Sequence, residues 1–249
     1  MRRYVTTAVW MIAAPLSVVV TLLMARNVWL TFGCYHLLVC LVLPWLDTVL
    51  LRRGSAGDHL WRVGLVGGRG DGMGAGVRTG GHAVDRAGIW SGIRAGLGLG
   101  LLLGGGTILV LAVWGDVFLA GNRIREVLAG WNVTPAQYPL MMTCMLLGNG
   151  AAEELFWRGF IHRRLESTSR RGGAIGLTAL AYTSYHGVTL GSFLAEIWLS
   201  VLCTAAVFAA GLFWGWLRER YGNVWPALLG HMGATAGYMV VFWREIATG

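Results

Sequence analysis

Two adjacent acids inside a long apolar run are the residues of this sequence that are best placed to do chemistry. Glu153 and Glu154 lie within a run that begins near Pro139 and ends near Ile161. The run is long enough to cross a bilayer, and an acid at the centre of a membrane helix costs about 2.5–3.5 kcal/mol on insertion scales. Because ionisable groups held in a membrane at that cost are functional by default, we take the two glutamates as the candidate catalytic pair.

Helical geometry gives the two carboxylates different surroundings. Glu154 and Arg158 stand four residues apart with the acid first, so they can form an ion pair along one helix face. Glu153 points about 100° away, toward the surface that carries Asn149 one turn earlier. This pattern favours one acid held by arginine and one acid left free for chemistry. The alternative is a buried ion pair that only fixes helix packing.

Two later apolar runs each carry a central histidine. Tyr182 lies one turn before His186, and Thr235 lies one turn after His231. Either histidine alone could be no more than an interhelical hydrogen-bond donor. Counting about 1.5 Å per residue from the expected cytoplasmic ends places Glu153 about 12 Å, His186 about 20 Å and His231 about 10 Å deep. A carboxylate and two imidazoles in one cavity can activate water and stabilise an oxyanion.

The composition indicates an integral membrane protein. The chain has 249 residues, of which 55% are hydrophobic and 13% are charged, whereas about 25% are charged in an ordinary soluble domain. The net charge of +8 comes from arginines that lie mainly between apolar runs, so we expect a lipid bilayer and no nucleic acid as partner. The four cysteines contain no CxxC spacing, which argues against a structural zinc site or a disulfide framework.

Seven apolar runs predict an all-α bundle of about seven transmembrane helices. Residues 1–138 form its N-terminal part, and residues 139–249 form the expected catalytic core. The small residues of the third run predict a helix that packs centrally. Residues 52–93, rich in Gly and Arg, predict a flexible cytoplasmic loop. The runs cover residues 5–24, 28–51, 95–119, 139–161, 173–194, 197–217 and 224–243.

The distribution of arginine predicts the orientation in the membrane. With the N-terminus in the cytoplasm, the inside segments hold fifteen arginines and the outside segments hold four. This excess follows the positive-inside rule. All basic residues are arginine, as is typical of a GC-rich bacterial genome, so we expect the bacterial cytoplasmic (inner) membrane as the location.

The three polar elements together resemble the CPBP family of intramembrane proteases, which includes the CAAX-processing endopeptidase of prenylated proteins. The family pattern is Glu-Glu-x-x-x-Arg, then Phe-x-x-x-His, then His-x-x-x-Asn or Asp, on successive core helices. The resemblance covers about residues 139–243, with tyrosine in place of phenylalanine and threonine in place of the last amide or acid. The matching positions are Glu153, Glu154, Arg158, Tyr182, His186, His231 and Thr235.

The resemblance implies an intramembrane endopeptidase and a role for each residue. Glu153 would be the general base that activates water with the help of His186, and His231 would stabilise the oxyanion. Arg158 would hold Glu154, which orients the site. The expected supporting residues are Asn149, Tyr182 and Thr235.

Several alternatives remain open for the chemistry and the function. The favoured site has no cofactor, but Glu153, His186 and His231 could instead be three zinc ligands with water in the fourth position. The expected substrate is a membrane-anchored protein or peptide, such as a bacteriocin-type peptide or a C-terminal sorting helix. A non-catalytic immunity or scaffold protein is one alternative. A small transporter is another, although no obvious inverted repeat supports it.

Overall fold

The structure is a computed structural model that describes residues 2–51, 55–66, 86–118, 121–166 and 171–247. All regular structure in these residues is helical. The helical segments, with η marking 3-10 or π-helical geometry, are α1 (Arg2–Val18), η1 (Val19–Met24), α2 (Val28–Thr31), η2 (Phe32–Val42), α3 (Leu43–Leu46), η3 (Asp47–Leu51), α4 (Ala56–Arg62), α5 (Arg86–Phe118), α6 (Gly121–Gly130), η4 (Pro135–Gln137), α7 (Tyr138–Thr143), η5 (Cys144–Asn149), α8 (Gly150–Glu154), η6 (Leu155–Ile161), α9 (His162–Glu166), α10 (Arg171–Phe193), α11 (Ile197–Tyr221), α12 (Trp225–Phe242) and η7 (Trp243–Ala247).

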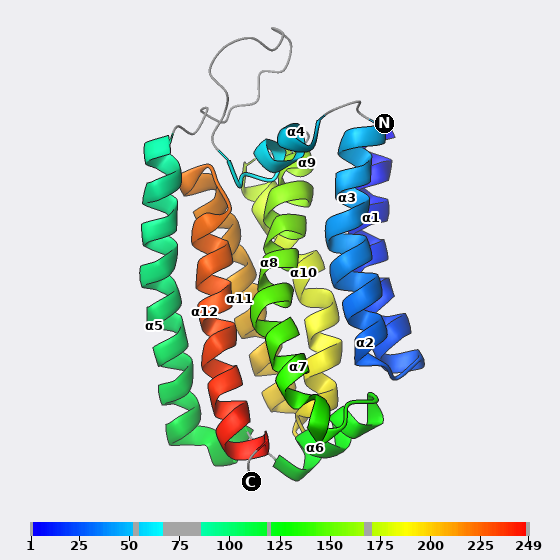
Figure 1. The fold of residues 1–249 in the computed structure, drawn as a ribbon, viewed down its shortest axis with the longest axis vertical. Helices are drawn as coiled ribbons and strands as arrows, with labels where there is room; N and C mark the ends of the chain where they lie inside the picture. Colours follow the sequence, from blue (N-terminus) through cyan, green and yellow to red (C-terminus); the bar gives the residue numbers. More distant parts are fainter. Residues whose placement is uncertain (1, 52–54, 67–85, 119–120, 167–170, 248–249) are drawn as a thin grey trace, which may run out of the picture.

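Each predicted apolar run forms a helix or an unbroken series of helical segments, and these lie side by side in one bundle (Figure 1). The all-α prediction is therefore confirmed, and the protein is an integral membrane protein. Among the described residues, four spans are apolar and long enough to cross a membrane, namely Val5–Met24, Val28–Leu50, Arg86–Gly115 and Ile197–Tyr221. The three other predicted spans, formed by α7 to α9, α10 and α12, carry the polar residues of the candidate site. The count of seven crossings stays a prediction.

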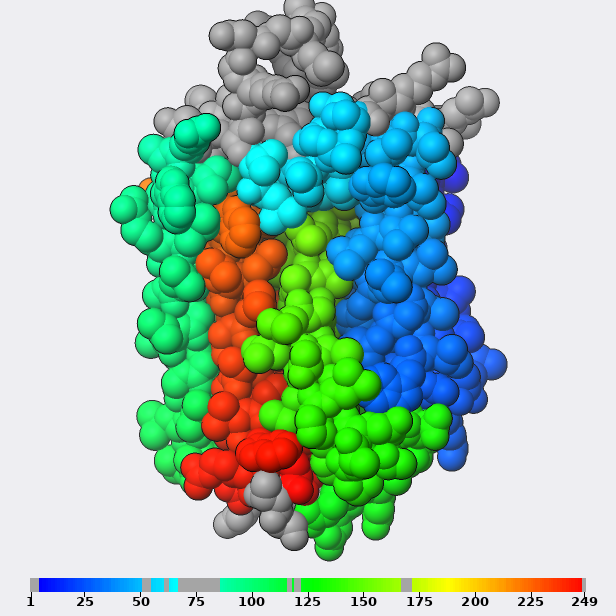
Figure 2. Space-filling model, in the orientation of Figure 1, coloured from blue at the N-terminus to red at the C-terminus, as the bar shows by residue number. Residues whose placement is uncertain are grey.

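The first two apolar runs form a helical hairpin that packs against the central run of residues 138–166. Asn27 begins the second run, because its Oδ1 accepts hydrogen bonds from the backbone N–H groups of Trp29 and Leu30 at 3.0 and 3.1 Å. Figure 2 shows the central run between this hairpin and α12. The hairpin and the central run share a buried core that includes Tyr35, Val39, Cys40, Phe156 and Trp157.

Glycines bring α5 and α12 into close contact. A Cβ atom added to Gly233 of α12 would clash with the carbonyl oxygen of Gly100 on α5. The close approach predicted from small residues is therefore confirmed. The prediction that this helix packs centrally is wrong, because α5 lies at the edge of the bundle (Figure 1). Its outer face exposes Leu101 and Leu102, which suit contact with lipid.

The segment 52–93, predicted as one flexible loop, is helical in two of its parts. α4 occupies residues 56–62, and α5 already begins at Arg86. The loop prediction is wrong for these parts, and the Gly/Arg-rich residues 67–85 lie outside the described residues.

Hydrogen bonds from the turn between α11 and α12, and from the first residue of α12, account for the ordered structure at both ends of this segment. Trp225 donates a hydrogen bond from Nε1 to the carbonyl oxygen of Leu65 at 3.0 Å. Asn223 donates from Nδ2 to the carbonyl oxygen of Gly88 at 3.3 Å. The partners are more than a hundred residues apart in the chain, so the local composition of the segment does not reveal them.

The segment with Arg123 and Arg125, between two predicted spans, is the helix α6. Arg123 donates from Nε to the carbonyl oxygen of Phe193 at the end of α10, at 3.0 Å. Arg125 donates from Nη1 to the carbonyl oxygen of Ile246 in η7, at 2.9 Å. These arginines thus bind carbonyl groups that the ends of other helices leave without an intrahelical partner.

Candidate active site

Glu154 and Arg158 form the expected ion pair in the middle of the bundle. Arg158 donates from Nη1 to Oε1 of Glu154 at 3.0 Å, and both side chains are fully buried. Arg158 also donates from Nη2 to the carbonyl oxygen of Gly211 at 3.2 Å, and its guanidinium lies 4.4 Å from the ring centre of Tyr182. These contacts fix the arginine, which in turn fixes the position of Glu154.

His231 joins this pair, which the sequence did not predict. Its Nδ1 lies 3.0 Å from the same Oε1 of Glu154 that Arg158 binds. A carboxylate can only accept a hydrogen bond here, so Nδ1 carries the proton. Glu154 therefore sets the orientation and tautomer of His231, as a carboxylate does for the histidine of a catalytic triad. The other ring nitrogen of His231 is turned toward Glu153.

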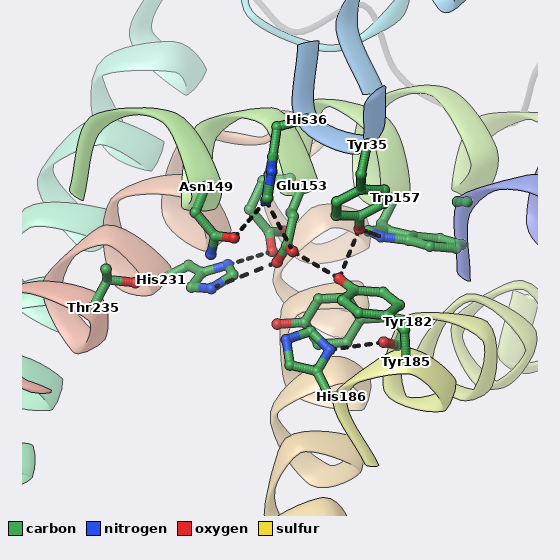
Figure 3. Close-up of polar contacts among 12 residues, drawn as sticks. Tyr35, His36, Asn149, Glu153, Trp157, Tyr182, Tyr185, His186, His231 and Thr235 are labelled. Atoms are coloured by element: carbon green, nitrogen blue, oxygen red, sulfur yellow. Dashed lines mark hydrogen bonds and ion pairs between the residues drawn. The ribbon is translucent and has the colours of Figure 1, made fainter. Parts of the chain in front are cut away.

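Glu153 binds a different set of side chains from Glu154, as an offset of about 100° on the helix predicts, and these side chains surround it in Figure 3. Its Oε1 accepts a hydrogen bond from the hydroxyl of Tyr185 at 2.7 Å. That hydroxyl accepts from the hydroxyl of Tyr35 at 2.7 Å, which accepts from Nε1 of Trp157 at 3.0 Å. The three donors form one chain directed at a single carboxylate oxygen, and so they fix the Glu153 side chain.

The second carboxylate oxygen of Glu153 is buried but unpaired. Within the described part of the chain, Oε2 of Glu153 has no hydrogen-bond partner, although the residue is only 2% exposed. Nε2 of His231 lies 3.9 Å from it. Buried carboxylate oxygens in proteins normally have a partner, so this one requires an explanation.

His36 is a polar residue of the site that the sequence analysis did not select. Its Nε2 donates to Oδ1 of Asn149 at 2.7 Å and lies 3.8 Å from Oε1 of Glu153. Asn149 lies between His36 and His231 in Figure 3. One signal was present, because the dipeptide Tyr35-His36 repeats the dipeptide Tyr185-His186.

His186 lies beside Glu153 rather than against it. Its Nδ1 lies 2.9 Å from the carbonyl oxygen of Tyr182, to which it donates. Its ring centre lies 4.4 Å from that of Tyr182 and 4.3 Å from that of Tyr185. Tyr185 thus connects the two groups, since its ring contacts His186 and its hydroxyl binds Glu153.

Thr235 is fully buried one turn after His231. Its Oγ1 accepts a hydrogen bond from the hydroxyl of Tyr238 at 3.4 Å. Among the described residues, no hydrogen bond joins Thr235 to His231. The structure therefore gathers Glu153, Glu154, Arg158, Asn149 and His231, places Tyr182 and His186 next to them, and holds Thr235 to one side.

The alternative zinc ligands do not converge. Three ligand atoms that share one ion must lie close to one another, and in the described part of the chain the group that does so is His162, Glu166 and Glu219. Glu153, His186 and His231 form no such group. In this structure the three side chains therefore do not place their ligand atoms around one point.

Comparison with known proteins supports the resemblance seen in the motifs. Residues 135–237 match the family model described as type II CAAX prenyl endopeptidase Rce1-like. The matched segment contains all the motif residues, whereas Tyr35 and His36 lie before it. Searches of curated proteins and of solved structures gave no match.

Proposed function

We propose that this chain, whose residues 135–237 match the Rce1-like model, is a CAAX-type intramembrane endopeptidase in which Glu153 activates water. The observation that carries the proposal is the open oxygen of Glu153. A buried carboxylate with one oxygen fixed by Tyr185 and the other without a protein partner is arranged to bind a water molecule. A carboxylate placed within hydrogen-bond distance of water can take its proton.

The two carboxylate oxygens of Glu153 have different roles in the proposed reaction. Oε2 takes a proton from water as the water oxygen attacks the carbonyl carbon of the peptide bond. The carbonyl π electrons move to oxygen and give a tetrahedral oxyanion. Collapse of this intermediate breaks the C–N bond, and Glu153 returns the proton to the leaving nitrogen. The hydrogen bond from Tyr185 keeps Oε1 in place throughout, so that Oε2 alone exchanges protons.

His231 is the group that we assign to the oxyanion. Glu154 fixes its Nδ1 and the ring turns Nε2 toward Glu153, so an N–H at Nε2 would donate to a developing negative charge. Nε2 lies 3.9 Å from Oε2 of Glu153, so base and oxyanion donor face one site. His186 acts through Tyr185 in this proposal, since its ring packs on the tyrosine that binds Glu153.

Asn149 takes the place of the amide that the family has one turn after the last histidine. Position 235 is threonine here, and its hydroxyl accepts from Tyr238. Asn149 is 8% exposed and lies beside His231, with Oδ1 bound to His36. Its amide N–H groups make no hydrogen bond to a described residue, so they are available as a second oxyanion donor.

This assignment predicts a larger loss of activity from Asn149→Ala than from Thr235→Ala. Removal of one oxyanion donor typically lowers kcat by about 10²–10³-fold, so we expect that loss for Asn149→Ala and less than about tenfold for Thr235→Ala. Initial rates at saturating substrate measure both. Equal effects of the two substitutions would contradict the role of Asn149.

The experiment that tests the function uses the full-length chain in proteoliposomes. The probes are a farnesylated peptide that ends in a CAAX sequence and an unprenylated peptide that carries a C-terminal apolar helix. We expect mass spectrometry to show cleavage of at least one probe at a single bond. The proposal fails if neither probe is cleaved, or if His231→Ala and the unsubstituted protein release the same fragment at the same rate.

The arginine distribution supports an orientation with the N-terminus and α4 on the cytoplasmic side. Cleavage at the depth of Glu153 then calls for a substrate that enters from the membrane, and a membrane-anchored peptide meets that condition. Peptides of the bacteriocin type and C-terminal sorting helices both belong to this class.

A further inference from the structure

His162 is a buried histidine outside the candidate active site. It begins α9, one turn after Arg158, and its side chain is fully buried. Neither of its ring nitrogens makes a hydrogen bond. A buried polar group without such a bond loses its interactions with water and gains none in return, which is unfavourable. Its environment must therefore supply another kind of partner.

The partners that face His162 are two carboxylates from two helices. Nε2 lies 3.4 Å from Oε1 of Glu166, four residues later on α9, and 3.5 Å from Oε1 of Glu219 on α11. The three ligand atoms all lie within 4.8 Å of one another. A histidine and a glutamate on one helix face, completed by an acid from a neighbouring helix, form a mixed nitrogen and oxygen ligand set.

The two short distances equal the separation expected between neighbouring ligand atoms of one metal ion. Zinc binds nitrogen and oxygen ligands at about 2.0–2.2 Å, and tetrahedral geometry then separates neighbouring ligand atoms by about 3.4 Å. The distances from His162 to the two glutamates match that separation. On the third edge, the ligand atoms of Glu166 and Glu219 lie within 4.8 Å of each other. This edge can shorten because the Glu166 side chain is 37% exposed, which leaves it room to move toward Glu219.

We propose that His162, Glu166 and Glu219 bind a divalent transition-metal ion, with Zn²⁺ as the best fit, at the end of the bundle that holds α4. One imidazole and two carboxylates suit zinc, and three protein ligands leave the fourth position for water. The exposed edge of Glu166 gives the ion a path of entry. The site is distinct from Glu153 and does not take part in hydrolysis.

Neighbouring arginines set the strength and the role of this site. Arg218 interacts electrostatically with both carboxylates, and Arg163 interacts with Glu166. These positive charges weaken the attraction for a cation, so we expect weaker binding than at a four-cysteine zinc site. Arg218 also donates from Nε to the carbonyl oxygen of Arg158 at 3.2 Å. An ion at His162 would therefore link α9 to α11 directly beyond the turn that carries Arg158.

The test is calorimetric titration of Zn²⁺ into the full-length protein, purified in detergent without a polyhistidine tag and first treated with a chelator. We expect one ion per chain. Loss of an outer-shell partner of a metal site already costs about 10–100-fold in affinity, so His162→Gln, which removes a ligand, should lower the affinity by more than about 100-fold. Glu153→Gln should bind Zn²⁺ as the unsubstituted protein does.

Glu166→Gln is the second variant, because this partly exposed position tolerates substitution without unfolding the protein. It should also weaken binding, and circular dichroism checks that both variants remain helical. The proposal is overturned if the unsubstituted protein shows no saturable binding, or if His162→Gln and Glu166→Gln keep its affinity. Loss of binding in Glu153→Gln would place the ion at the other site and would overturn the proposal as well. An imidazolium between two carboxylates would explain the same distances, and absence of binding is the result that it predicts.

Discussion

Glu153→Gln is expected to lower kcat by at least about 10²–10⁴-fold, which is the usual contribution of a general base. Glutamine has nearly the same shape, and its carbonyl oxygen can still accept the hydrogen bond that Tyr185 donates to Oε1. Its amide cannot take a proton from water. KM should change little, because the substitution removes a group that acts in the transition state rather than in substrate binding.

The same substitution should leave the protein at least as stable as before. An ionised carboxylate that is 2% exposed and has one unpaired oxygen is costly to bury, and a neutral amide is less so. Rates of peptide cleavage and thermal unfolding in detergent, measured on one preparation, separate the two effects. Glu196→Gln is the matched control, because this glutamate precedes α11, outside the site, and should keep full activity. If Glu153→Gln cleaved the probe at an unchanged rate, a buried ion-pair network without catalysis would explain the site better.

Helical periodicity predicted the local geometry of the site but not its contacts between helices. The pairing of Glu154 with Arg158 and the divergence of Glu153 follow from 3.6 residues per turn, and the structure shows both. The contact between His231 and Glu154 depends on the axial position and on the rotation of α12 relative to α8. No spacing within one helix encodes that placement, so a depth but no partner could be predicted for His231.

The contribution of Tyr35 and His36 was hidden for a related reason. They lie in an apolar run without charged neighbours, outside the segment that carries the family motifs. Only the packing of the N-terminal hairpin on the central run brings them to Glu153. The helical ends of segment 52–93 were likewise hidden, since Trp225 and Asn223 order them from far along the chain.

Arg158→Met is expected to destabilise the fold by about 3–5 kcal/mol, the cost of removing one partner from a buried ion pair. Methionine fills much of the same volume but leaves Glu154 as a fully buried carboxylate with only His231 beside it. The substitution also removes the hydrogen bond to the carbonyl oxygen of Gly211 and the contact with the ring of Tyr182. Reversible unfolding in mixed micelles, with increasing denaturing detergent, measures the change.

The double variant Glu154→Gln/Arg158→Met shows whether the unpaired charge is the cause. It contains no buried carboxylate at position 154, so it should be more stable than Arg158→Met alone. Arg244→Met is the matched control, because Arg244 pairs with Glu245 at 3.9 Å while 68% exposed, and surface pairs contribute about 0–1 kcal/mol. A double variant that unfolds as easily as the single one would assign the loss to packing around Gly211 and Tyr182. In that case Arg158 would support the shape of the site, and Glu154 could hold His231 in place without it.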